Sequence, residues 1–265
     1  MKPVIVVRGG GDIATGTIHR LHRSGYRVLV LELENPSAIR RRVAFCEAVF
    51  ENTATVEGVT CRRADSLAAA NQIMEAGEVA LLVDAAGTAL EILKPKVLID
   101  AILAKKNLGT NRRMAEFTIG LGPGFSAGQD VDCVIETMRG HSLGRLIYAG
   151  QAMPNTGVPG LIQGVGKERV LHAPAAGRIK NKRDISDFVE KDETIAMIGE
   201  TPVKATVSGI LRGIIRDGYP VTAGLKIADI DPRKSEKENC FTISDKARCI
   251  AGSVLEAVLA WECGR

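Results

Sequence analysis

The feature that most constrains the fold is the alternation of short apolar runs with helical stretches over the first hundred residues. Apolar runs at 4–7, 27–33, 60–63, 79–83 and 96–99 have the length of buried strands. Helical patterns separate most of them, and this alternation predicts a parallel sheet with helices on both faces. Ligands of such sheets bind at the carboxyl ends of the strands, so the residues that directly follow strands are the first candidates for a site.

A glycine turn follows the first run. Gly9-Gly10-Gly11-Asp12-Ile13-Ala14 fits the pattern G-x-G-x-x-G/A between a strand and a helix. In a Rossmann-like domain such glycines let the backbone approach a pyrophosphate, and the helix N-terminus favours its charge. Glu32 stands about 20 residues further on, where a carboxylate holds ribose hydroxyls. We therefore predict that a nucleotide-type ligand binds at Gly9, Gly10, Gly11, Asp12, Ile13 and Glu32; the alternative is a glycine turn without a ligand.

Further residues are predicted to complete the cleft. Arg41, within an arginine triplet on the second helical stretch (37–49), is assigned to anionic groups of the ligand, with a solvated helix face as the alternative. From 109 to 166 glycine is dense and helical periodicity is absent, which indicates a β-rich region. In the turn Gly122-Pro123-Gly124-Phe125, we expect Gly122, Gly124 and Phe125 to line the cleft.

The segment Glu136-Thr137-Met138-Arg139-Gly140-His141 brings an acid, a guanidinium and an imidazole to a strand end. A histidine acts as a general base near neutral pH, and an arginine holds an anion. We predict Glu136, Arg139 and His141 as catalytic residues, with Arg139 also in contact with the cofactor. The alternative is a capped turn with an internal Glu–Arg pair. No metal site is expected.

Residues 173–230 contain an internal repeat with an offset of 32 positions. Ala173 aligns with Ala205, Gly177 with Gly209 and Ile195 with Ile227, among other pairs. Each unit is too small to bury a face alone, so the two are expected to close on each other. A polar linker and a C-terminal helix at 246–261 follow the repeat.

Composition excludes several classes of protein. With 45% hydrophobic and 25% charged residues the chain is not intrinsically disordered. Aromatics at 4% and a net charge of only +4 argue against a nucleic-acid partner and suit an anionic small molecule. No segment reaches the ~20 apolar residues that span a bilayer, and the first residues do not resemble a signal peptide. We therefore expect no membrane association, a cytoplasmic location and six reduced cysteines.

The motifs resemble the YqeB-type family, whose members are accessory proteins of the selenium-dependent molybdenum hydroxylase system in anaerobic bacteria. The resemblance covers roughly residues 4–232, and the stretches that carry it are 7–16, 121–125, 136–145, 154–160 and 173–177. The N-terminal part is also similar to the Rossmann domain of XdhC-type proteins, which mature molybdenum hydroxylases. The repeat resembles a biotinyl/lipoyl-type barrel-sandwich hybrid, although the link 199–204 lacks the exposed lysine of such carriers.

The expected fold class is α/β, with a Rossmann-like domain (1–108), a β-rich region completing the cleft (109–170), a barrel-sandwich-hybrid-like module with the repeat (171–232), and a linker with the C-terminal helix (233–265). The resemblance implies maturation of molybdenum hydroxylases through a molybdopterin nucleotide, with the apo-hydroxylase or other maturation factors as partners. The alternatives are an NAD(P)-dependent oxidoreductase and a non-catalytic scaffold. Whether the protein is an enzyme or forms a homo-oligomer stays open.

Overall fold

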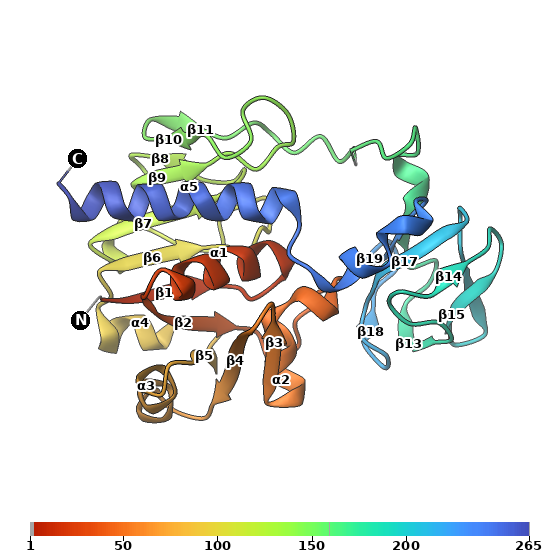
Figure 1. Ribbon diagram of the computed structural model, residues 1–265, viewed down its shortest axis with the longest axis horizontal. Helices are drawn as coiled ribbons and strands as arrows, with labels where there is room; N and C mark the ends of the chain where they lie inside the picture. Colours follow the sequence, from red (N-terminus) through yellow and green to blue (C-terminus); the bar gives the residue numbers. More distant parts are fainter. Residues whose placement is uncertain (1–2, 159, 265) are drawn as a thin grey trace. The chain divides into compact units, whose positions relative to one another are not determined.

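The computed structural model describes residues 3–158 and 160–264, which form two compact units (Figure 1). The first unit comprises residues 1–36, 44–155 and 243–265, and the second comprises residues 37–43 and 156–242. Each unit is therefore built from segments that lie far apart in the sequence.

A nine-stranded mixed sheet forms the centre of the first unit. The strand order is β10-β9-β7-β6-β1-β2-β5-β4-β3. Only the outer pairs β3–β4 and β9–β10 are antiparallel; every other neighbouring pair is parallel. The strands are β1 (Val4–Arg8), β2 (Arg27–Glu32), β3 (Thr53–Val56), β4 (Val59–Ala64), β5 (Val79–Val83), β6 (Val97–Asp100), β7 (Phe117–Leu121), β9 (Cys133–Ile135) and β10 (Leu146–Ile147); β8 (Ser126–Ala127) pairs separately with β11 (Gly150–Gln151).

The central strands are apolar along their whole length because both of their faces are covered. In β1, Ile5, Val6 and Val7 have no exposed surface, and β2, β5 and β6 are equally buried at their centres. Strands of a parallel sheet that are covered on both faces are expected to read as continuous apolar runs. The runs at 4–7, 27–33, 60–63, 79–83 and 96–99 correspond to β1, β2, β4, β5 and β6.

Helices α1 (Asp12–Arg23) and α5 (Asp245–Glu262) lie side by side over the central strands (Figure 1). A Cβ atom at Gly16 of α1 would lie 2.8 Å from the Cβ of Ala247, so glycine permits this close approach. Near the other end of α5, the Trp261 ring stacks on Phe117 with 5.8 Å between centroids. The remaining α-helices are α2 (Ala48–Glu51), α3 (Leu67–Glu75) and α4 (Thr88–Leu93). Within the described residues, no helix is long and apolar enough to cross a membrane.

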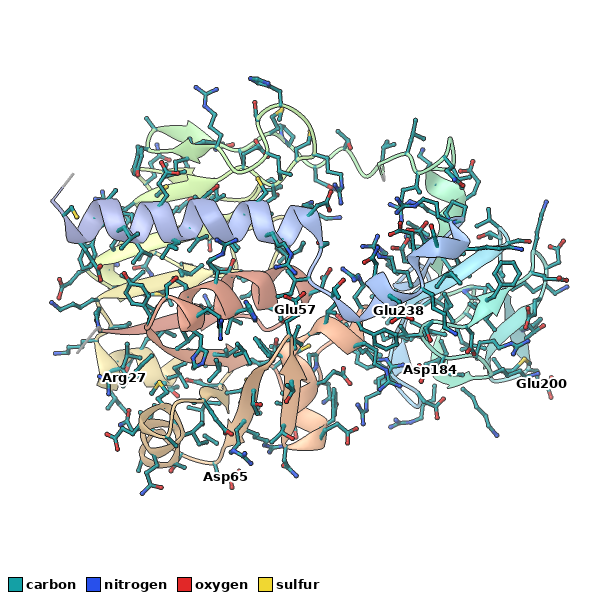
Figure 2. The ribbon with its side chains drawn as sticks, viewed as in Figure 1. Arg27, Glu57, Asp65, Asp184, Glu200 and Glu238 are labelled. Carbon is teal, nitrogen blue, oxygen red and sulfur yellow. The ribbon has the colours of Figure 1, made fainter. Side chains whose placement is uncertain are left out.

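The turn between β3 and β4 holds the start of α5. Glu57, labelled in Figure 2, accepts a hydrogen bond from the backbone N–H of Ile243 at 2.8 Å. Its two carboxylate oxygens also accept from the Arg248 guanidinium at 2.6 and 2.8 Å. These contacts join the C-terminal helix to a hairpin nearly 190 residues earlier in the chain.

The second unit contains two four-stranded sheets. Their orders are β12-β19-β17-β14 and β16-β15-β13-β18. Residues 37–43 also belong to this unit, where Arg41 and Arg42 each donate to Asp184 at 2.9 Å. Asp184 is labelled in Figure 2. The strands are β12 (Val170–His172), β13 (Gly177–Asn181), β14 (Phe188–Val189), β15 (Thr194–Ile198), β16 (Thr201–Lys204), β17 (Gly209–Ile214), β18 (Pro220–Val221) and β19 (Lys226–Asp231).

The predicted fold class is wrong. We expected a Rossmann-like N-terminal domain followed by a separate β-rich region, but β6 pairs with β7 and β7 with β9, so both regions form one large mixed sheet. The expected barrel-sandwich-hybrid-like module built from two repeats is wrong as well. Each sheet contains strands from before and from after residue 200, and residues 37–43 complete the unit. Strands of two to six residues bury too little surface to form a sheet from either half alone.

A further difference concerns the helix expected over 37–49. The structure has 3-10 turns at Arg41–Val43 and Phe45–Glu47 and the short helix α2 instead. The Arg41 side chain donates to the backbone carbonyl of Ile214 at 2.8 Å, so residues 37–43 are held by the second unit and a continuous helix does not form.

Candidate functional site

The carboxyl ends of the parallel strands meet along one edge of the nine-stranded sheet. Strand β1 lies between β2 and β6. The chain leaves β1 toward β2 on one side and leaves β6 toward β7 on the other side, so the two connections diverge at the carboxyl ends of these neighbouring strands. This is a topological switch point, where open α/β sheets bind ligands. Loops after β1, β6, β7 and β9 touch in a row, since glycines of one loop meet backbone or side-chain atoms of the next: Gly9 meets Ala101, Gly124 meets Lys106 and Gly122 meets Thr137.

The glycine turn after β1 is held tightly at two of its three positions. Gly9 donates from its N–H to the carbonyl of Leu31 at 2.8 Å, and it has a φ of 93° that favours glycine. The Gly10 carbonyl accepts from the N–H of Cys46 at 2.9 Å, and a Cβ at Gly10 would lie 2.9 Å from that nitrogen. Gly11 differs, because a Cβ there would have no neighbour within 4 Å. The open part of the turn is therefore Gly11 and the first turn of α1, with Asp12 and Ile13.

Glu32 braces this turn. Its Oε2 accepts from the N–H of Gly10 at 2.7 Å, and its Oε1 accepts from the N–H of Leu33 at 2.7 Å. The side chain is nearly buried; burial raises the pKa of the carboxyl, and the two N–H groups oppose the shift. Both oxygens are thus engaged by the backbone, and the ribose contact expected of Glu32 has no support in this geometry.

A buried polar cluster underlies the switch point. The Arg8 guanidinium lies 3.6 Å from the Asp100 carboxylate, and both residues end neighbouring strands. Thr110 joins them, accepting from Arg8 at 2.5 Å and donating to Asp100 at 2.6 Å. All three side chains are less than a tenth exposed. The available sequence signal is a charged residue at the end of each of two otherwise apolar strands. Asp100 stands at a strand end, where either a catalytic group or a helix cap is expected, and Arg8 was missed.

The three predicted catalytic residues have separate surroundings. Glu136 is buried, and its oxygens accept from the N–H groups of Met138 at 2.7 Å and Met153 at 2.8 Å. Arg139 donates both terminal nitrogens to Asp245 at 2.9 and 3.0 Å. His141 is exposed, and within the described part of the chain no hydrogen bond to its ring is present. The structure thus brings the segment to the carboxyl edge without joining the three side chains in one constellation.

Only some of the other residues predicted to bind the cofactor lie at the carboxyl edge of the sheet. Gly122 and Gly124 belong to the row of touching loops. Phe125 is buried and lies under Gly120, where a Cβ would come within 2.5 Å of its ring, so it is a core residue. Arg41 belongs to the second unit, where Ile214 and Asp184 engage it.

Lys246, at the start of α5, is the cation that the sequence analysis missed. Desolvation by burial lowers the pKa of its amine, and the Arg139 charge lowers it further, whereas Asp12, Glu136 and Asp245 act in the opposite direction. Lys246 therefore lies within electrostatic range of the glycine turn and of the 136–139 segment. Sequence gives no hint of this, since more than 230 residues separate Asp12 from Lys246.

We expect the amine of Lys246 to become reactive at a lower pH than an ordinary lysine with its pKa of 10.5. Brief acetylation across the neutral to alkaline range, followed by peptide mass spectrometry, measures this midpoint. In Arg139→Gln the midpoint should move up, because one positive neighbour is lost and Asp245 is released to favour the charged amine. An unchanged midpoint in that variant would contradict the assignment.

Metal ligands do not cluster in the described residues: 3–158 and 160–264 hold no group of three or more His, Cys, Asp or Glu side chains placed to bind an ion. The residues at the carboxyl edge are instead suited to an anion, with backbone N–H groups at the start of α1 and a lysine nearby.

Comparison with known proteins gives one strong match. Over 256 residues, 97% of this chain, the sequence is 50% identical to the uncharacterized protein YqeB of Escherichia coli (strain K12). The chain is therefore a relative of YqeB. It spans about half the length of that relative, 47%. No family model matches the chain.

Solved structures show only a faint likeness to this relative of YqeB. The ectoine utilization protein EutE (DoeB) from Ruegeria pomeroyi, bound to product, is 12% identical over 86% of this chain and 85% of that one, with a TM-score of 0.26. An aspartoacylase family protein from Mesorhizobium loti is 12% identical over 86% and 84%, with a TM-score of 0.25. Likenesses at this level say nothing about the activity of the chain.

Proposed function

We propose that this chain binds the phosphate group of a nucleotide-type ligand, a molybdopterin nucleotide, at the Gly9–Gly11 turn and serves in the maturation of selenium-dependent molybdenum hydroxylases. The hydroxylase apo-enzyme or another maturation factor would be its partner in the cytoplasm. The observation that carries the proposal is the open space at Gly11, directly at the N-terminus of α1 and at the switch point of the sheet.

Electrostatics at the turn support an anionic ligand. The first N–H groups of a helix have no partner within the helix, and the helix dipole favours negative charge there. Gly11 precedes α1 with an extended backbone and contributes no side chain to fill the space. The Asp12 carboxylate opposes an anion, and the nearby charge of Lys246 offsets it.

The residues present fit a phosphate better than they fit the ribose of a dinucleotide. Gly11, Asp12 and Ile13 would hold the phosphate through backbone N–H groups, and Lys246 would add positive charge. The N–H of Gly10, which the dinucleotide pattern offers to a pyrophosphate, is bound to Glu32. For this reason we do not extend the proposal to an NAD(P)-dependent oxidoreductase.

The pair Gly11→Asp and Gly11→Asn tests the proposal. Both side chains fit the open space at a φ of −66°, and both cap helices well, so both variants should fold. Either side chain competes for the first-turn N–H groups, but only aspartate adds a negative charge that repels the phosphate. We therefore expect ligand affinity at least about tenfold lower in Gly11→Asp than in Gly11→Asn, a difference of about 1.4 kcal/mol.

The measurement is the amount and identity of the small molecule released on denaturation, from protein made in a host that produces molybdopterin nucleotides. Equal ligand content in the two variants would refute binding at the turn. Released NAD in place of a pterin nucleotide would refute the assigned ligand. Partner binding that persists in Gly11→Asp without any ligand would favour a scaffold.

A further inference from the structure

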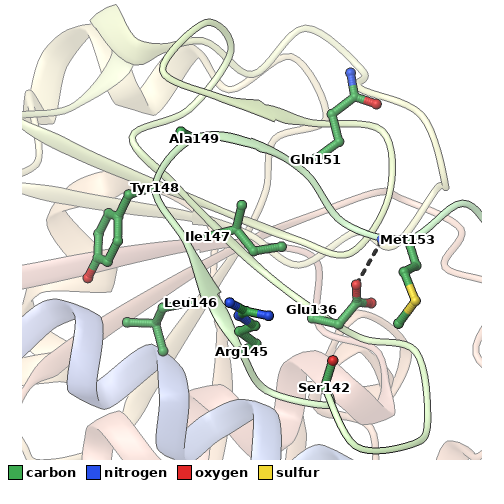
Figure 3. Close-up of a pocket in the computed structure, with 9 residues that line it drawn as sticks. All are labelled: Glu136, Ser142, Arg145, Leu146, Ile147, Tyr148, Ala149, Gln151 and Met153. Atoms are coloured by element: carbon green, nitrogen blue, oxygen red, sulfur yellow. Dashed lines mark hydrogen bonds between the residues drawn. The ribbon is translucent and has the colours of Figure 1, made fainter.

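A pocket of about 420 Å³ lies beside β10, within the loop that runs from Glu136 to Met153 (Figure 3). Its volume is within the range of small-molecule sites, roughly 300–1,000 Å³. The wall is partly apolar, with Leu146, Ile147, Ala149 and Met153, and partly polar, with Ser142, Arg145, Tyr148 and Gln151. None of these residues belongs to the site proposed at the glycine turn.

The shape of the pocket depends on Glu136. Its carboxylate joins the two ends of the loop, because it accepts from Met138 on one side and from Met153 on the other, and Figure 3 shows the second of these bonds. A hydrogen bond from the N–H of Glu136 to the carbonyl of Arg145 closes the base of the loop at 3.0 Å. The wall is therefore held in place by hydrogen bonds within the protein.

Arg145 supplies a charge that the protein leaves unneutralised. In the same unit Arg139 is paired with Asp245 and Arg112 with Asp132. Across residues 3–158 and 160–264 no side chain or carbonyl accepts from the Arg145 guanidinium. The acid in the same wall, Glu136, already accepts hydrogen bonds from two backbone N–H groups. A guanidinium presents paired donors that match the oxygens of a carboxylate or a phosphate.

We propose that this pocket binds a small organic anion, with a carboxylate or phosphate head on Arg145 and an aromatic or other apolar body against Leu146, Ile147 and Met153. Tyr148, which is half exposed, adds an aromatic surface at the rim. The head fixes orientation through Arg145, and the body contributes by burial of apolar surface. This site is independent of phosphate binding at Gly11.

Titration of the full chain with benzoate and with phenyl phosphate tests the proposal, using benzamide as the neutral analogue of benzoate. Amide ¹H–¹⁵N spectra locate the site: signals of Leu146, Ile147, Ala149 and Gln151 should shift with the bound anion. In the benzoate titration the signal of Gly11 should not shift; a Gly11 shift with phenyl phosphate would report its phosphate at the glycine turn and is counted separately from the pocket. We expect at least one of the two anions to bind at least about tenfold more tightly than benzamide.

Variants separate this pocket from the glycine turn and from general surface charge. Arg145→Met should weaken binding of the anion at least about tenfold, whereas Arg113→Met removes an exposed arginine outside the pocket and should leave it unchanged. Gly11→Asp should also leave it unchanged, so failure of the proposed function and failure of this inference are distinguishable. Equal affinity for benzoate and benzamide, full affinity in Arg145→Met, or no binding of either anion would overturn the inference.

Discussion

Replacing Arg8 by methionine should lower the free energy of unfolding by about 3–5 kcal/mol, the usual effect of removing one partner from a buried ion pair. The change leaves the Asp100 carboxylate, which is 1% exposed, with only neutral partners. Methionine matches the length and apolar stem of arginine, so the loss comes chiefly from the uncompensated charge. Urea unfolding followed through Trp261, the one tryptophan of the chain, measures the effect in the first unit.

The control is the double variant Arg8→Met/Asp100→Asn. Asparagine removes the buried charge, retains an oxygen for the N–H of Ile102, and offers an N–H to the hydroxyl of Thr110. It should therefore be more stable than Arg8→Met alone. A loss below about 1 kcal/mol in Arg8→Met would show that the pair contributes little beyond a surface ion pair.

The strands of the first hundred residues could be predicted because their signal is local. An apolar run such as Val4–Val7 or Val79–Val83 is buried on both faces, and burial alone selects those residues. The sequence did not reveal which strands pair with one another or which unit each segment joins. Strand β7 pairs with β6 and β9 and so joins two regions that were expected to be separate, and residues 37–43 are held by the second unit through Arg41 and Asp184. Such contacts depend on partners far away in the chain.

In the candidate site, too, features with a local sequence signal could be predicted and contacts between distant residues could not. Local spacing located the turn Gly9–Gly11 at the start of a helix. It could not reveal that Glu32 and Glu136, both read as functional carboxylates, are occupied by backbone N–H groups. A carboxylate at a strand end has the same sequence signature whether it meets a ligand or its own loop. Lys246 was missed for a related reason, since the packing of α5 on α1 brings it near Asp12.

That packing leads to the second prediction, in which the same substitution has opposite effects at two helical glycines. Gly16→Ala in α1 should lower the free energy of unfolding by about 1–3 kcal/mol, because the new Cβ would lie 2.8 Å from the Cβ of Ala247 and 3.0 Å from its carbonyl oxygen. Gly252→Ala in α5 meets nothing within 4 Å, so the better helix propensity of alanine should stabilise the protein by up to about 1 kcal/mol. Thermal and urea unfolding of the two variants measure this contrast, and destabilisation of similar size in both would contradict the close-packing argument.

The contact at Gly16 also connects stability to the candidate site. Ala247 directly follows Lys246, so an added methyl group that separates α5 from α1 should move the lysine away from the glycine turn. We therefore expect Gly16→Ala to weaken phosphate-ligand binding as well as stability, and Gly252→Ala to leave binding unchanged. In the double variant Gly16→Ala/Ala247→Gly the contact between the two Cβ atoms is absent, although the carbonyl of residue 247 remains close. Partial recovery of both stability and binding in that variant would tie the position of Lys246 to the packing of the two helices, whereas recovery of stability alone would show that the lysine does not act on the turn.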